Sequence, residues 1–186
     1  MMKNYANEYG LALYNLGVEA NCSKAIFEDF GFVAEVFENQ PEFTRLLSNP
    51  MLTAGERADA VRSVFGGKIN QYLLNMLMIF AEKRRFDMLS KCWLEYRRNY
   101  CKANNILPVT ATTVQPLTEE QKAKLIQKLT AKTGSQILLT CVVNPKYLGG
   151  IMLEYDGKRV DASVKNRFAE MRQLLKQSDL SPESGS

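Results

Sequence analysis

The stretch YRRNYCKANNILPVTATTV, residues 96–114, contains the point at which the sequence pattern changes from helix to strand. Before Asn104 and Asn105, apolar residues recur three and four positions apart, as they do on the buried face of an α-helix. After them, residues 106–114 are rich in valine and threonine, whose branched side chains favour strands. We therefore predict a mainly α fold, with a helical bundle in residues 1–104 followed by a small α+β domain in residues 105–177.

Upstream of this point, four stripes of apolar residues predict amphipathic helices, each with one face in a core. The stripes are Tyr5, Tyr9, Ala12, Leu13 and Leu16; Ile26, Phe30, Val33 and Phe37; Ala54, Ala58, Val61 and Phe65; and Phe86, Leu89, Trp93, Tyr96 and Tyr100. Helix ends are indicated by Pro41, Asn49-Pro50, a capping-box spacing of Thr53 and Glu56, and Gly66-Gly67. These signals predict a bundle of about six helices.

Residues 68–83 differ from the other helical segments, because Tyr72–Leu74 and Met76–Phe80 make this segment apolar nearly all round. One interpretation is the central, fully buried helix of the bundle. The other is a helix with one face exposed as a docking groove for a partner helix.

Downstream of residue 105, strands are predicted at 106–114, 136–143 and 148–155. Asp156-Gly157 is a two-residue hairpin signal that returns the chain through 158–160. Thr118 and Gln121 have the spacing to cap a helix between the first two strands. A last helix is predicted from Val164, Phe168, Met171 and Leu175, and the polar residues 178–186 are expected to be a disordered tail.

The composition of the 186-residue chain excludes several kinds of functional site. There is no histidine, so histidine-based triads and metal sites that need imidazole are excluded. The four cysteines form no CxxC pair, and we expect them to be reduced and to bind no metal. The net charge of +4 is too small to prove a polyanionic partner. No apolar run reaches the length of about 18–20 residues that spans a bilayer, and the first ten residues do not look like a targeting signal, so we expect the chain to stay where it is made.

Three sequence patterns could indicate a functional site, and for each of them a simpler interpretation is available. Gly149 and Gly150 are followed by a predicted strand rather than a helix, which favours a tight turn over a phosphate loop. Asp161 and Ser163 have no base near them and are interpreted as the cap of the last helix. The basic clusters at 83–85 and 97–98 could bind RNA, with Tyr96 and Tyr100 stacking on bases, but a solvated face or a protein contact is the plainer interpretation.

Several motifs, in order, resemble the delta subunit family of F-type ATP synthases, whose mitochondrial member is the oligomycin-sensitivity-conferring protein. The resemblance covers residues 9–175, nearly the whole chain. The segments that carry it are Tyr9–Tyr14, Leu47–Pro50, Ala81–Arg85, Pro116–Gln121, and Asn144–Gly150 followed by Val160–Val164. Three positions depart from the family pattern. Gly10 replaces a usual alanine, Arg84 replaces a glycine, and Asn144 stands where aspartate is common.

The resemblance implies a noncatalytic stator subunit without a cofactor and without a nucleic-acid partner. Residues 1–104 would bind the N-terminal helix of an alpha subunit of the catalytic head, and residues 105–177 would bind the b subunit of the peripheral stalk. The family's alpha contact, carried over by position, implies a site made of Tyr9, Ala12, Leu13, Asn75 and Ile79. The protein would be a monomer within the complex, at the cytoplasmic face of a bacterial plasma membrane, and would be held there only through its partner subunits.

Overall fold

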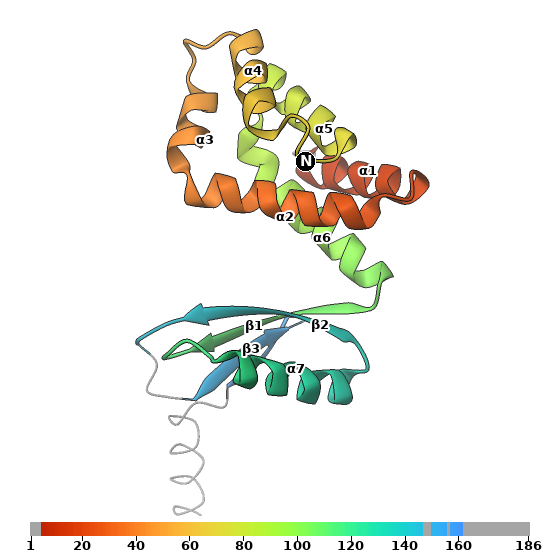
Figure 1. Cartoon of the computed structure of the whole chain (residues 1–186), viewed down its shortest axis with the longest axis vertical. Coiled ribbons are helices and arrows are strands. Elements are labelled where there is room, and N and C mark those ends of the chain that lie inside the picture. Colours follow the sequence, from red (N-terminus) through yellow and green to blue (C-terminus); the bar gives the residue numbers. More distant parts are fainter. Residues whose placement is uncertain (1–4, 147–149, 156, 162–186) are drawn as a thin grey trace, which may run out of the picture. The chain divides into compact units, whose positions relative to one another are not determined.

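The computed structural model describes residues 5–146, 150–155 and 157–161 (Figure 1). The chain divides into two compact units, Met1–Ala103 and Asn104–Ser186. Among the described residues, the first unit is helical and the second contains a four-stranded sheet and one helix. The predicted fold class, a helical bundle followed by a small α+β part, is confirmed.

The first unit contains six α-helices among its described residues, as predicted, together with one short 3₁₀ helix, Phe86–Met88. The α-helices are α1 (Tyr5–Glu19), α2 (Ser23–Asn39), α3 (Pro41–Ser48), α4 (Ala54–Phe65), α5 (Gln71–Lys83) and α6 (Leu89–Ala103).

Local sequence signals set helix ends as predicted. The hydroxyl of Thr53 accepts a hydrogen bond from the amide of Glu56, and the Glu56 carboxylate accepts one from the amide of Thr53. This capping box begins α4 and lowers the pKa of Glu56, because the hydrogen bonds from Thr53 favour the charged carboxylate. Pro41 lies in the first turn of α3, where its missing amide hydrogen costs nothing.

Helix α6 has buried residues on opposite sides of its axis. Cys92 and Cys101 are nine positions apart, half a rotation around the helix, and both are buried. On a third side, Trp93 packs against Phe27 and Phe30 of α2. All four cysteines of the chain are free, as expected.

Helix α5 has an exposed face, contrary to the first interpretation of residues 68–83. Leu73, Leu77 and Phe80 lie in the core, whereas Tyr72 and Ile79 are exposed. The interpretation as a fully buried helix was wrong. Apolar residues all round a helix permit its burial, but they do not show that other elements cover every face. In the free chain, one face of α5 has no described element over it.

The predicted core stripe of α1 is also wrong. Its buried residues are Ala6, Gly10, Leu13 and Gly17. Of the five residues in the predicted stripe, only Leu13 is buried, while Tyr9 is half-buried and Tyr5, Ala12 and Leu16 are exposed. Apart from Leu13, the larger apolar side chains of the stripe thus lie on the flank of the helix, and the other buried residues are small.

A buried arginine replaces one expected core position of α4. Ala54 is exposed, whereas Arg57 is only 2% exposed. Its Nε donates to the carbonyl oxygen of Ala81 at 2.8 Å, and its Nη1 donates to the carbonyl oxygen of Leu52. These hydrogen bonds replace the water that a buried guanidinium loses, and they tie α4 to the end of α5.

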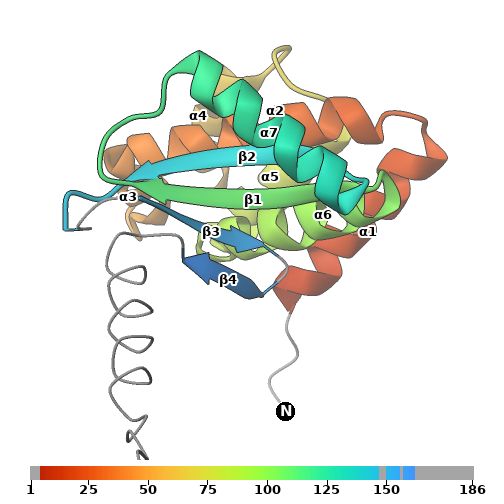
Figure 2. The same cartoon turned by 90° about the horizontal axis from the view of Figure 1, so that it is seen from below.

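In the second unit, four strands and one helix form a two-layer arrangement (Figure 2). The elements are β1 (Ile106–Thr113), α7 (Glu119–Thr133), β2 (Gln136–Val143), β3 (Ile151–Tyr155) and β4 (Lys158–Asp161). The strand order is β2-β1-β3-β4, with β1 parallel to β2 and the other pairs antiparallel. Val109, Ile137 and Leu129 of α7 form the core between the layers.

The loop and hairpin signals are only partly within the described residues. β3 and β4 pair as a hairpin in which Tyr155 lies opposite Lys158, as the two-residue turn predicted. Gly157 and Gly150 both have positive φ, of 69° and 89°, which fits the prediction of a turn at Gly150. Asp161 is the last residue of β4. Gly149, Ser163, the predicted last helix and the tail at 178–186 lie outside the described residues.

Candidate partner-binding surface

Helix α1 lies close to α6 at Gly10 and close to the start of α2 at Gly17. A Cβ atom added to Gly10 would lie 2.6 Å from the carbonyl oxygen of Cys92, and one added to Gly17 would lie 3.1 Å from the Cα of Ser23. Gly10 therefore has no room for a side chain, whereas at Gly17 a side chain would fit only if its neighbours moved by a few tenths of an ångström. The larger side chains of α1 are left to its outer and lateral faces.

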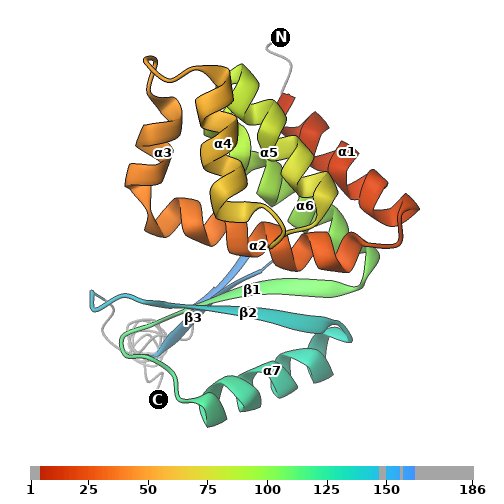
Figure 3. The same ribbon diagram turned by 45° about the horizontal axis from the view of Figure 1, so that its top comes forward.

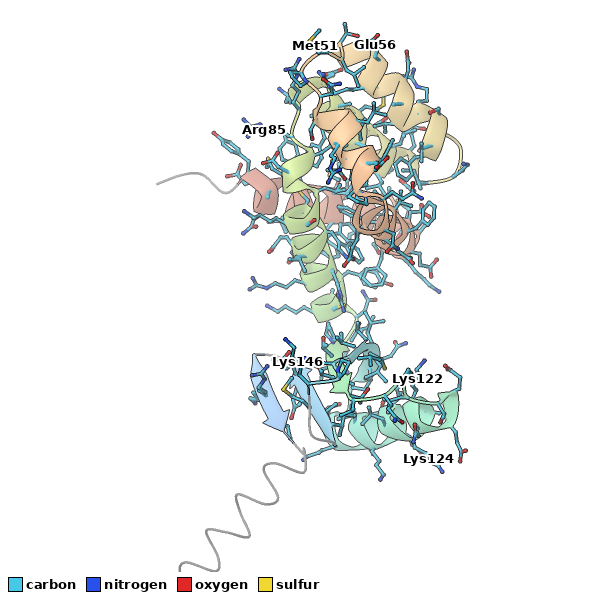
Figure 4. All side chains as sticks on the ribbon, turned by 90° about the vertical axis from the view of Figure 1, so that its left-hand side faces the viewer. Met51, Glu56, Arg85, Lys122, Lys124 and Lys146 are labelled. Atoms are coloured by element: carbon cyan, nitrogen blue, oxygen red, sulfur yellow. The ribbon has the colours of Figure 1, made fainter. Side chains whose placement is uncertain are left out.

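One lateral face of α1 borders α5. The ring of Tyr9 packs edge-on against Phe80 with the ring centroids 5.4 Å apart, and Figure 3 shows the two helices running side by side. At the start of α1, the guanidinium of Arg85 lies over the ring of Tyr5, 5.8 Å from its centroid (Figure 4). The first turn of α1 is thus beside the end of α5, and the two helices run in opposite directions.

Four of the five site residues implied by the resemblance reach the surface of this helix pair. Ala12 and Asn75 are exposed, Ile79 is 37% exposed, and Tyr9 is half-buried against Phe80. Leu13 does not belong with them, because it is 3% exposed and lies in the core.

The structure adds three exposed apolar side chains that the sequence analysis did not place in the site. Tyr5 and Leu16 share the helical spacing of Tyr9 and Ala12, and Tyr72 lies one turn before Asn75 on α5. Tyr5 and Leu16 belong to the apolar stripe that the sequence shows in α1. That stripe was assigned to the core, so these two residues were not predicted to lie at a binding surface. We define the α1–α5 surface as Tyr5, Tyr9, Ala12, Leu16, Tyr72, Asn75 and Ile79.

The α1–α5 surface contains no ionisable carboxylate or ammonium group. Its polar member Asn75 accepts a hydrogen bond from the side chain of Gln71 on the same helix, at 2.8 Å. Charged groups lie beside it, with Arg85 over Tyr5 at one end. An apolar strip along two antiparallel helices matches the apolar face of a third helix and offers nothing for bond-making chemistry.

The described residues offer no metal-binding cluster as an alternative site. That part of the chain holds no group of three histidine, cysteine or acidic side chains suited to a metal ion. Burial raises the pKa of the Cys92 thiol to about 12, so this cysteine is not a thiolate nucleophile at neutral pH. No helix in the described part is long and apolar enough to cross a membrane.

The structure also weakens the RNA-binding alternative. Tyr96 is fully buried and donates a hydrogen bond from its hydroxyl to the carbonyl oxygen of Ser23, at 2.8 Å. Tyr100 is 7% exposed and stacks on Phe27, with the ring centroids 4.3 Å apart. Neither ring is available to stack on a base.

Comparison with known proteins agrees with the fold and identifies the family. The family described as ATP synthase delta (OSCP) subunit matches residues 5–175. The chain is 30% identical over 164 residues to ATP synthase subunit delta of Fusobacterium nucleatum, covering 88% of this chain and 94% of the relative. It is 27% identical over 167 residues to the subunit delta of Clostridium kluyveri, covering 90% and 92%.

A solved structure shares the fold across both units. A chain of the Toxoplasma gondii mitochondrial ATP synthase hexamer superposes with a TM-score of 0.70 at 19% identity, covering 95% of this chain and 98% of that one. The resemblance seen in the motifs is therefore confirmed over nearly the whole length. The chain belongs to the ATP synthase delta (OSCP) subunit family.

Proposed function

We propose that this chain is a noncatalytic stator subunit of a rotary F-type ATP synthase. It would join the catalytic head to the peripheral stalk and so keep the head from turning with the central shaft. The observation that carries the proposal is an uncovered apolar strip, the α1–α5 surface, on a member of the delta subunit family. A subunit whose role is to hold two other parts of the complex together needs binding surfaces and no catalytic group.

The partner at the α1–α5 surface would be the N-terminal helix of an alpha subunit. The 15 residues of α1 span about 22 Å, enough to contact roughly four turns of a partner helix. Its apolar face would cover Tyr5, Leu16, Tyr72 and Ile79. Each of these is now partly exposed, and covering each would contribute on the order of 1 kcal/mol.

Close packing within the first unit suits a part that resists torque. The backbone contact at Gly10 and the buried hydrogen bonds of Arg57 join α1 to α6 and α4 to α5. Neither contact depends on long, flexible exposed side chains. A force applied at the α1–α5 surface would thus pass into the core of the unit.

Residues 105–177, which lie in the second unit, would bind the b subunit of the stalk. The protein would act as one copy in the complex, at the cytoplasmic face of the bacterial plasma membrane and attached only through partner subunits. A chain ending at residue 103 tests this division, because it should fold, bind alpha and lose all binding to b. A truncated chain that remains folded and still binds b would refute it.

Reconstitution tests the function itself. Membrane vesicles stripped of this subunit should recover proton-driven ATP synthesis when the wild-type chain is added. Ala12→Asp should restore less at a given concentration, because docking would bury an unpaired carboxylate at a cost of about 1–3 kcal/mol. Ala25→Asp, at a position on α2 that is also exposed, is the matched control and should restore synthesis fully. Full recovery with Ala12→Asp would remove this residue from the site.

A further inference from the structure

A second surface, on α6, is not used by the proposed stator contacts. Lys91, Leu94, Arg98 and Lys102 are spaced three, four and four positions apart, so they lie along one side of the helix. All four are exposed, and Leu94 is 59% exposed. We name these residues the α6 stripe.

The α6 stripe is positively charged, and nearby carboxylates neutralise little of this charge. The carboxylate of Glu95 lies 3.9 Å from Arg98, but the Glu95 side chain is 19% exposed and also accepts a hydrogen bond from Asn99. Within the described residues, neither Lys91 nor Lys102 forms an ion pair. The stripe therefore presents three cations in water around one apolar side chain.

We propose that the α6 stripe binds an acidic amphipathic helix of a partner protein. One apolar side chain of the partner would cover Leu94, and carboxylates one turn away on either side would meet Lys91 and Arg98. Two helices in contact can satisfy this arrangement because both repeat every three to four residues. The contact is independent of the α1–α5 surface, whose residues lie on two other helices.

A nucleic acid fits the α6 stripe less well. Phosphates would pair with the cations but would leave Leu94 uncovered at the centre. The neighbouring rings of Tyr96 and Tyr100 are buried and cannot stack on bases. The central leucine therefore distinguishes the two partners experimentally.

Fluorescence anisotropy with the full chain tests the proposal. The probe is a labelled alanine-based helical peptide with one central leucine, flanked on the same face by glutamates one turn away on each side. Replacing its glutamates by glutamine gives the control peptide. We expect saturable binding of the glutamate peptide only, weakening several-fold when salt rises from about 0.05 to 0.5 M because exposed ion pairs are screened.

Variants of the stripe give the decisive comparison. Reversing both charges in Lys91→Glu/Arg98→Glu should weaken binding by about tenfold or more, and Leu94→Ser by roughly fivefold. Lys128→Glu changes an exposed lysine of α7 and should bind as the wild type does. The near-ultraviolet circular dichroism and melting temperature of each variant establish that it is folded.

Three results would overturn the proposal. A loss in Lys128→Glu that is half as large, on a logarithmic scale, as the loss in Lys91→Glu/Arg98→Glu would mean that the peptide responds only to overall charge, because Lys128→Glu changes the net charge by half as much. Unchanged binding in Leu94→Ser would remove the apolar contact. Displacement of the peptide by a uridine oligonucleotide, with an affinity lowered by the charge reversals but not by Leu94→Ser, would make the stripe a nucleic-acid surface.

Discussion

The close contact between α1 and α6 makes an unusual prediction about Gly10. The family usually has alanine here, and alanine favours a helix interior over glycine by about 0.5–1 kcal/mol. Both facts favour Gly10→Ala as a stabilising change. The structure predicts the opposite, because the new Cβ would lie 2.6 Å from the carbonyl oxygen of Cys92 and 2.9 Å from the Cβ of Glu95.

The expected magnitude follows from these distances. The Cys92 carbonyl belongs to the helix backbone, so it cannot move aside as the end of a flexible side chain can. Forcing one extra methyl group into such packing costs about 1–3 kcal/mol. With the middle of that range, about 2 kcal/mol, and a gain in helix propensity of about 0.5–1 kcal/mol subtracted, Gly10→Ala should lower the free energy of unfolding of the first unit by about 1–1.5 kcal/mol.

Urea unfolding followed by tryptophan fluorescence measures this change in the first unit alone. Trp93 is the chain's one tryptophan and packs in the first unit against Phe27 and Phe30. With a urea dependence of about 1.5 kcal/mol per M, the midpoint should fall by about 1 M.

Gly31→Ala is the matched control, since Gly31 is also within a helix. A Cβ there would lie 3.7 Å from the ring of Trp93, an ordinary contact. Its midpoint should rise, because only the gain in helix propensity remains. A midpoint for Gly10→Ala equal to or above that of the wild type would refute the close contact.

Three further predictions concern buried or strained groups of the first unit. In the same urea assay, Arg57→Met should lower the free energy of unfolding by about 3 kcal/mol, because two charge-assisted hydrogen bonds are lost. A decrease of less than about 1 kcal/mol would contradict the role of these hydrogen bonds. Arg84 ends α5 with φ of 53°, so Arg84→Gly should raise the free energy of unfolding by about 0.5 kcal/mol, after loss of its exposed hydrogen bond to Pro50. The urea midpoint should therefore rise slightly, and a lower midpoint would argue against strain. Burial raises the pKa of Cys92 from 9.0 to about 12 and also raises that of Tyr96, so the folded state keeps protons that the unfolded state loses. Stability should therefore fall as pH rises above about 9, and a flat pH profile of the urea midpoint between pH 8 and about 11 would contradict this.

Structural features that depend only on residues close together in the sequence were predictable from the sequence. The capping box of Thr53 and Glu56 works within one helical turn, and the hairpin at Gly157 needs only a two-residue loop. The fold class followed from such signals together with the change of pattern at residue 104. The strand order β2-β1-β3-β4 was not predicted, because pairing between strands far apart in sequence leaves no local pattern.

The errors in the first unit share one physical origin. Periodicity identifies apolar residues on one face of a helix but does not say which element covers that face. In α1 the covered face has Gly10 and Gly17, which carry no apolar side chain, so the stripe of larger residues was assigned to the core. The buried Arg57 was missed for a related reason, since one of its two partners, the carbonyl group of Ala81, is distant in sequence.

These errors also bear on the candidate site. Ala12, Asn75 and Ile79 were placed by family resemblance and are exposed, while Leu13 is buried. Tyr5 and Leu16 could have been added from the sequence once the stripe of α1 was assigned to the surface. Their exposure depends on how tightly α1 packs on α6, which only the three-dimensional contacts reveal.

The most direct test of the stator proposal is a calorimetric titration of the full chain with a synthetic peptide of the alpha-subunit N-terminus from the same organism. We predict saturable one-to-one binding that weakens about tenfold or more in Ala12→Asp and is unchanged in Ala25→Asp. Absence of binding by a chain that circular dichroism shows to be folded, or equal binding by both variants, would contradict the assignment of the α1–α5 surface.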